Sequence, residues 1–268
     1  MNGPLLRYTF RSNVARLVVI AAGLVLMGVI MPVMYAAFGQ EMTDFIEATP
    51  FFSQLLQNFG GGDALSLTGS MSMAFTHPFT LLLMGIMAIA FPALAIAGER
   101  EKGTLEVTLS RPVSRRGLLA TLFVAGLLFI FALVGVLVIT TGITAFAVGF
   151  GDELEVVNLA WLWLGGGLLF VAFMALAFEA SVESDRSGPA LGIPAIFVLL
   201  NYLAFAIGSI WPDVKVLGDW SMFNLLKARQ VLEGGVQVVD YAILVLFTLV
   251  FLAIALYRFP RRDLPAPS

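Results

Sequence analysis

Long apolar stretches separated by short polar segments dominate the sequence, and this is the pattern of a protein that crosses a membrane several times. A helix needs about 20 mostly apolar residues to cross the hydrocarbon of a bilayer. Six stretches reach that length, and we predict spans at residues 17–38, 79–97, 118–150, 159–180, 189–211 and 236–257. Unbroken apolar runs of this length exclude the alternating strands of a membrane β-barrel. The sequence therefore predicts an all-α integral membrane protein with six transmembrane helices in one domain over residues 1–268.

Several segments outside the central spans also carry helical patterns. Residues 1–16 are expected to form an interfacial helix, and the apolar run after them is too long for a signal peptide. The third apolar run exceeds one perpendicular crossing, so it should tilt or leave the membrane near Thr140. Residues 39–77 form a long loop, expected to hold two short interfacial helices; a lid over a vestibule is the alternative. Another short-helix segment is predicted at residues 212–235, before the last span.

The distribution of charge gives an orientation. Basic residues are enriched in cytoplasmic loops, and an inside N-terminus with six crossings puts twelve of the 15 basic residues on the inner side. Eleven of the 18 acidic residues then fall on the outer side. We therefore expect both termini in the cytoplasm, residues 98–117 on the cytoplasmic side, and residues 39–77 and 212–235 outside.

Composition narrows the function classes. The chain is 59% hydrophobic and 12% charged, with a net charge of −3, so no broad basic field indicates nucleic-acid binding. The chain contains no Cys, which excludes thiolate chemistry, and it contains one His. We therefore predict no metal site and no catalytic residue. Glu179 is the only acid expected within a span. Because it lies near the end of that span, it has two interpretations: a contact in a transport pathway or gate, or part of a solvated turn with Glu183, Asp185 and Arg186.

The segment at residues 98–117 combines dense charge with apolar residues. Thr104 is a candidate cap for a short helix that Arg111 and Pro112 would end, although the spacing of its apolar residues also fits a strand. Ser114 is a candidate cap for the following span. The sequence further predicts five arginines that anchor the protein at the membrane surface: Arg7, Arg11, Arg16, Arg115 and Arg116.

From Glu99 to Arg115 the chain resembles the cytoplasmic segment of ABC-2-type transporter permeases, which has the pattern Glu-Arg-Glu-x-Gly-Thr-Leu-Glu-x-x-Leu-Ser-x-Pro-Val-Ser-Arg. Residues 220–235 resemble the family's outer segment only loosely. The resemblance implies a single permease domain with a coupling helix that docks on an ATPase. It implies Leu105 and Leu109 as apolar plugs and Glu99, Arg100, Glu101, Lys102 and Arg111 as rim charges. The implied coupling residues are Glu99, Arg100, Glu101, Lys102, Gly103, Thr104, Leu105, Glu106, Leu109, Arg111 and Pro112.

The resemblance also implies partners. ATP and Mg²⁺ would bind two copies of a separate ATPase subunit, since no P-loop motif occurs here. A second copy of the permease, as a homodimer, or a related permease, as a heterodimer, would complete an exporter in the cell membrane, most simply a prokaryotic plasma membrane. Two alternatives are a polytopic membrane enzyme acting on lipid or peptide and a secondary transporter. A membrane enzyme would need paired catalytic groups, which the sequence does not offer. A secondary transporter would predict repeated broken helices, which the sequence pattern does not indicate.

Overall fold

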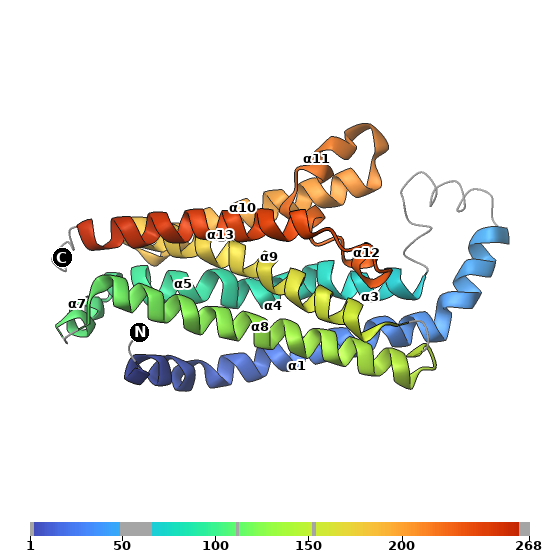
Figure 1. Ribbon diagram of the computed structural model, residues 1–268, viewed down its shortest axis with the longest axis horizontal. Coiled ribbons are helices and arrows are strands. Elements are labelled where there is room, and N and C mark those ends of the chain that lie inside the picture. The colour runs from blue at the N-terminus through green and yellow to red at the C-terminus, as the bar shows by residue number, and fades with distance from the viewer. Residues whose placement is uncertain (1–2, 49–65, 111–112, 152–153, 263–268) are drawn as a thin grey trace.

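The computed structural model describes residues 3–48, 66–110, 113–151 and 154–262, and every regular element in these ranges is a helix. Six helices are long and apolar enough to cross a membrane, which confirms the predicted fold class. The six candidate spans cover residues 3–39, 67–101, 115–147, 156–183, 187–209 and 238–261. Figure 1 shows them as an elongated bundle.

The first helix is longer than predicted. α1 (Gly3–Ala48) runs without interruption through the expected boundary between an interfacial helix and the first span, and it contains Pro32. It also continues through residues 39–48, so the first part of the expected outer loop is helical and joined to the span. The second short helix expected in that loop, around residues 52–59, lies outside the described residues. Whether residues 1–16 lie along the membrane surface stays a prediction.

The second span is a chain of short helical pieces. It consists of α3 (Leu67–Thr76), α4 (Pro78–Gly85), α5 (Phe91–Ala93) and α6 (Glu99–Glu101), with π-helical turns at Ile86–Ala90 and Leu94–Gly98. The span thus begins twelve residues earlier than predicted, since α3 occupies the end of the expected outer loop. Pro92 lies between the two π-helical turns, and its missing N–H favours such a local change in hydrogen bonding.

The other spans pack around α9 (Val156–Glu183), which lies between α8 (Arg115–Ala147), α10 (Ser187–Ile210) and α13 (Val238–Arg258). α8 is one continuous helix through Thr140. Both expectations for its length, a tilt in the membrane and an exit from the membrane near Thr140, stay predictions. The glycines at 165–167 bring α9 close to its neighbours: a Cβ on Gly167 would lie 2.4 Å from Phe131. These glycines therefore serve close helix packing.

The two ends of the bundle differ in content. The start of α1, the end of α13 and α7 (Thr104–Leu109) lie at one end, which we call the basic end, whereas α3, α11 (Lys215–Asp219) and α12 (Ala228–Leu232) lie toward the other (Figure 1). Residues 212–235 also form 3₁₀ turns at Pro212–Val214 and Met222–Leu225, so short helices occur where they were expected. Assignment of the basic end to the cytoplasm rests on the charge distribution.

Candidate functional site

The segment that carries the family resemblance folds as two short helices joined by a tight turn. α6 ends the second span, Gly103 turns the chain with φ 69°, and α7 follows. The strand interpretation of this segment is therefore wrong. So is the predicted cap, because Gly103 holds the N-cap position and the Thr104 hydroxyl instead donates to the carbonyl (3.2 Å) and carboxylate of Glu99. The cap at Ser114 is confirmed, since its hydroxyl accepts a hydrogen bond from the N–H of Gly117 at 3.0 Å.

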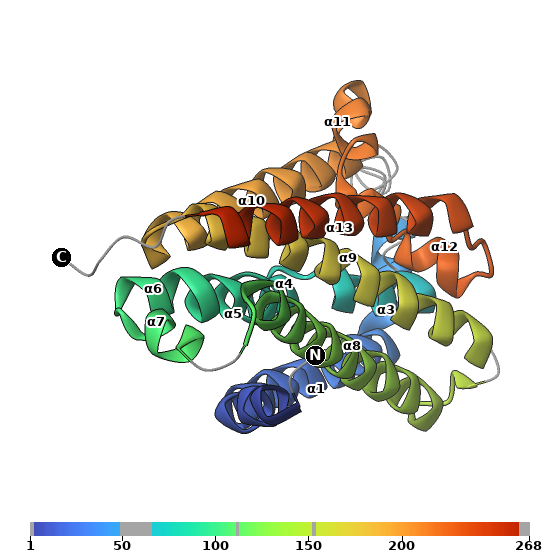
Figure 2. The same cartoon turned by 60° about the vertical axis from the view of Figure 1, so that its left-hand side comes forward.

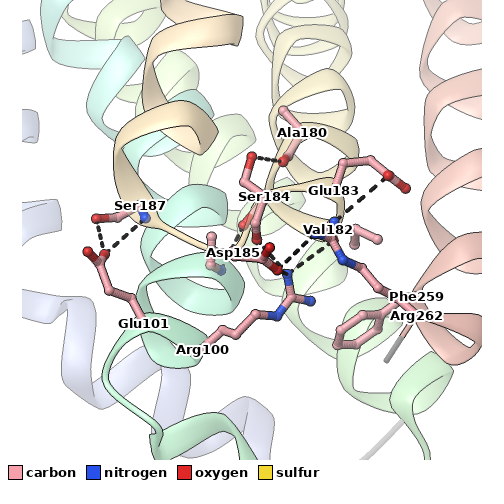
Figure 3. Close-up of polar contacts among 12 residues, drawn as sticks. Arg100, Glu101, Ala180, Val182, Glu183, Ser184, Asp185, Ser187, Phe259 and Arg262 are labelled. Carbon is pink, nitrogen blue, oxygen red and sulfur yellow. Dashed lines mark hydrogen bonds and ion pairs between the residues drawn. The ribbon is translucent and has the colours of Figure 1, made fainter. Parts of the chain in front are cut away.

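The side chain of Arg100, the middle residue of α6, is buried in the bundle. Its side chain is 4% exposed, and Nη1 donates to the main-chain carbonyls of Val182 (3.2 Å) and Ser184, with Asp185 at 3.7 Å (Figure 3). Nε and Nη2 are buried without a hydrogen-bond partner in the described residues. The interpretation of Arg100 as a rim charge is thus wrong, because the guanidinium is committed to the turn between α9 and α10.

Glu101 connects the same segment to α10. Its carboxylate accepts hydrogen bonds from the N–H (3.0 Å) and the hydroxyl of Ser187, the first residue of α10 (Figure 3). A carboxylate at this position satisfies a free main-chain N–H and complements the positive end of the helix. Adjacent residues of α6 therefore hold both sides of the α9–α10 turn.

Ser181 adds a link inside the bundle. Its hydroxyl donates to the carbonyl of Pro92 at 2.9 Å and accepts from the N–H of Ala97 at 3.0 Å. The side chain is fully buried. Ser181 therefore fastens the second π-helical turn of the second span to α9, one helical turn before the contacts made by Arg100.

The end of α13 and the residues after it complete the arrangement, because α13 ends at Arg258 and a 3₁₀ turn at Phe259–Arg261 leads to Arg262. Arg262 donates to the carbonyl of Val182 at 2.7 Å and to Asp185 at 2.8 Å, while Arg258 lies 3.1 Å from Glu183. The α9–α10 turn is therefore an ion-paired junction whose acids remain in contact with solvent, since the side chains of Glu183 and Asp185 are 39% and 57% exposed. We call the set that joins α6, α9, α10 and the end of α13 the basic-end network: Arg100, Glu101, Ser181, Asp185, Ser187 and Arg262.

Glu179 lies on the same side of α9 as this junction. Its carboxylate is 3.9 Å from Arg258 and its side chain is 19% exposed. The acid that the sequence places inside a span thus has a cation from α13 beside it. This contact reduces the cost of a carboxylate near the membrane. A role in a pathway or gate stays a prediction.

The apolar residues of α7 divide into a buried and an exposed set. Leu105 is 2% exposed and packs in the core of this chain, and Leu109 is half-buried. Leu105 therefore anchors α7 to the bundle, which contradicts its interpretation as a free plug. Val107 is 64% exposed, and Lys102 and Glu106 are exposed beside it. Arg111 and Pro112 lie outside the described residues.

The five arginines expected at the membrane surface have different surroundings. Arg7 and Arg11 are exposed on α1, whereas Arg16 is half-buried and donates to Asn13 at 3.1 Å. Arg115 donates to the carbonyls of Phe259 and Arg262, so it holds the start of α8 to the C-terminal turn. Arg116 is exposed, with Nε 3.4 Å from the carbonyl of Leu256. Contact of these residues with lipid stays a prediction.

Three members of the basic-end network were missed from the sequence: Ser181, Ser187 and Arg262. The available signal was weak. Serines recur at 181, 184 and 187 around the end of the fourth span, next to Glu183 and Asp185. Such a cluster indicates side chains that bond main-chain groups at helix ends, but only the packing of α6 and α13 against it identifies their partners.

Comparison with known protein families gives one match over almost the whole chain. Residues 9–264 match the family model described as "ABC-2 family transporter protein". No curated protein matches the chain. Members of this family are the membrane components of transporters, and these components are not themselves catalytic. The match agrees with the resemblance carried by Glu99 to Arg115. The chain therefore belongs to the ABC-2 transporter family.

Proposed function

We propose that this chain is the membrane-spanning subunit of an ATP-driven exporter and that residues 98–117 couple it to a separate ATPase. The family membership supports a transporter subunit over the two alternatives, a membrane enzyme and a secondary transporter. In this proposal ATP and Mg²⁺ bind the ATPase subunits, of which there are two for each pair of permease chains. The protein is a multi-pass component of a cell membrane, in the simplest case a prokaryotic plasma membrane.

The observation that carries the proposal is the two-sided construction of α6 and α7. On one side Arg100 and Glu101 fix the segment to the α9–α10 turn, and Leu105 fixes it to the core. On the other side Val107 and Glu106 are exposed. A segment that is fixed to its own chain and exposed to a partner can pass a displacement by that partner on to the spans. A flexible loop would change its own conformation instead.

The route of that push follows the second span. α6 continues directly from the π-helical turn at Leu94–Gly98, and Ser181 joins this turn to α9. Displacement of α7 would therefore move the second span, α9 and α10 together. Coupling of this kind requires that the ATPase bind α7 with different affinity in its two nucleotide states.

Exposed apolar surface supports the expected pairing with a second permease or with lipid. α10 has several large apolar side chains that are more than half exposed, among them Ile193, Ile196 and Leu199. Such a face needs lipid or another helix to cover it. A homodimer or a heterodimer with a related permease would provide part of that cover.

A docking test uses the exposed side of α7. The double variant Glu106→Lys, Val107→Asp replaces exposed side chains, so the fold is expected to persist. When the full-length permease is co-purified with its ATPase subunit, we expect the bound ATPase to fall at least tenfold. Val216→Asp, at an equally exposed apolar position (58%) on α11 at the other end of the bundle, is the matched control and should retain binding. Undiminished ATPase binding by the α7 variant, with its thermal stability unchanged, would overturn the docking assignment.

A further inference from the structure

An open cavity of about 760 Å³ lies at the basic end, between the N-terminal part of α1, the end of the second span, α7 and the start of α8. This volume is within the range of small-ligand sites, roughly 300–1,000 Å³. One wall is a single face of α1, because Leu5, Thr9 and Asn13 are spaced by four residues and Arg16 follows three residues later. Figure 2 shows α1, α7 and the start of α8 around this region.

The lining of the cavity is divided between apolar and charged side chains. Phe91, Leu118 and Leu122 are buried and form an apolar wall, and Leu94 beside them is 37% exposed. Arg16, Lys102 and Glu99 supply charge from α1 and from α6 and its flanks. A site with an apolar wall and a charged margin fits an amphiphilic ligand, which has an apolar part and a charged part.

The charges favour an anion. Thr9 and Asn13 donate to carbonyls of α1 itself, each at 2.9 Å, so these polar groups are already satisfied. The carboxylate of Glu99 accepts the hydroxyl of Thr104. Arg16 uses Nη1 for Asn13, and because a guanidinium carries five N–H donors, this bond leaves donors for a ligand. Arg16 and Lys102 are thus the groups that can bind a negatively charged head.

We propose that this cavity binds an anionic amphiphile, with its phosphate or carboxylate head at Arg16 and Lys102 and its acyl chain along Phe91, Leu94 and Leu122. The charge distribution of the chain puts the basic end in the cytoplasm, where membranes carry anionic lipid heads. Two sources share this chemistry: a phospholipid of the cytoplasmic leaflet and an anionic amphiphile that the transporter moves. The site adjoins the proposed coupling segment, residues 98–117, since Leu105 and Val107 of α7 also line the cavity.

Binding is measured with the purified full-length permease in neutral detergent, titrated with fluorescent phosphatidylglycerol. We expect saturable binding that phosphatidylcholine and inorganic phosphate do not compete. Arg16→Gln and Lys102→Gln should each weaken it on the order of fivefold, and Arg16→Lys should retain most of the affinity. Ala95→Trp, which places an indole at a half-buried lining residue, should abolish binding by filling the cavity.

Arg11→Gln is the matched control, because Arg11 is an exposed arginine of α1 that does not line the cavity. The affinity of the Arg11→Gln variant for phosphatidylglycerol should remain within twofold of that of the unchanged protein. Thermal unfolding of every variant checks that the fold persists. Equal loss of binding in the Arg11 and Arg16 variants would overturn the proposal, because it would show a general surface charge effect. So would binding that survives Arg16→Gln, Lys102→Gln and Ala95→Trp.

The two sources are separated with the permease and its ATPase in vesicles. Phosphatidylglycerol that changes leaflet on addition of ATP in a manner dependent on Arg16 is cargo, whereas lipid that stays in its leaflet while binding persists is a resident ligand. This second step rests on the proposed function. The binding measurement uses the permease alone, so it can succeed or fail independently of ATPase docking.

Discussion

Ser181 in α9 accepts a hydrogen bond from the main-chain N–H of Ala97 in the second span, at 3.0 Å. The hydroxyl also donates to the carbonyl of Pro92, so one buried side chain serves both sides of a π-helical turn. The turn leads directly into α6, which holds Arg100 and Glu101. The position of α6 and α7 thus depends on packing between two spans as well as on their own charges.

Loss of this hydroxyl should loosen the junction. We expect Ser181→Ala to lower the free energy of unfolding by about 1 to 3 kcal/mol, the range for buried polar groups that lose a partner. Denaturant titration in mixed micelles measures the change. Ser184→Ala is the matched control, because among the described residues the Ser184 hydroxyl bonds the carbonyl of Ala180, one turn earlier in the same helix, and should matter less. Equal losses in the two variants would contradict a link specific to the π-helical turn.

Arg100→Met separates stability from coupling. The variant removes donors to Val182 and Ser184, yet it also removes two buried nitrogens, Nε and Nη2, that have no hydrogen-bond partner among the described residues. These effects oppose each other, so we expect a modest destabilisation of about 1 to 2 kcal/mol. Transport by the assembled complex should fall at least tenfold, since α6 loses its link to the end of α9 and keeps only the contact of Glu101 with Ser187, while ATPase binding stays within twofold.

Arg116→Met is the control for the loss of a positive charge at the same end. Arg116 is exposed and makes one long contact to the carbonyl of Leu256. Transport by this variant should stay close to that of the unchanged protein. The coupling role of Arg100 fails if the two methionine variants transport equally well.

The turn between α6 and α7 predicts an order of tolerated residues at position 103. Gly103 has a φ of 69°, a conformation that side chains with a Cβ adopt at a cost of about 1 to 2 kcal/mol, with Asn the least affected. We expect stability and ATP-driven transport to decrease in the order Gly, Asn, Ala, Val. Thermal unfolding and vesicle transport measured on the same preparations test this. A Val variant equal to Asn would show that the turn does not require a left-handed residue.

Much of the fold was predictable because lipid imposes a simple rule on sequence. Each span must be long and apolar, so six spans and a helical fold follow from the pattern alone. Boundaries followed less well. α1 continues through residues 39–48 and α3 begins at Leu67, because a helix extends beyond the membrane wherever the following residues tolerate it. Composition does not show where the apolar stretch ends and the helix continues.

The candidate site was predictable in location but not in the direction of its side chains. The motif from Glu99 to Arg115 indicated the segment, yet Arg100 and Leu105 are buried in this chain while Val107 is exposed. A helix of a few residues has a face that only its neighbours determine. Partners such as Ser187 and Asp185 lie more than 80 positions away in sequence, so local patterns could not connect them to α6.

Glycine shows the same difference between residue type and surroundings, and it yields a last prediction. A Cβ on Gly167 would lie 2.4 Å from Phe131, whose ring packs on Trp163 at 5.2 Å. A Cβ on Gly192 would have no described atom within 4 Å apart from its chain neighbours and the backbone of its own helix. Gly167→Ala should therefore destabilise by about 1 to 3 kcal/mol, while Gly192→Ala should be neutral or stabilise by up to about 1 kcal/mol. Phe131→Leu should offset part of the Gly167→Ala loss in a double-mutant cycle. If unfolding titrations find the two glycine positions equally sensitive, the close approach of α8 and α9 at Gly167 does not contribute to stability.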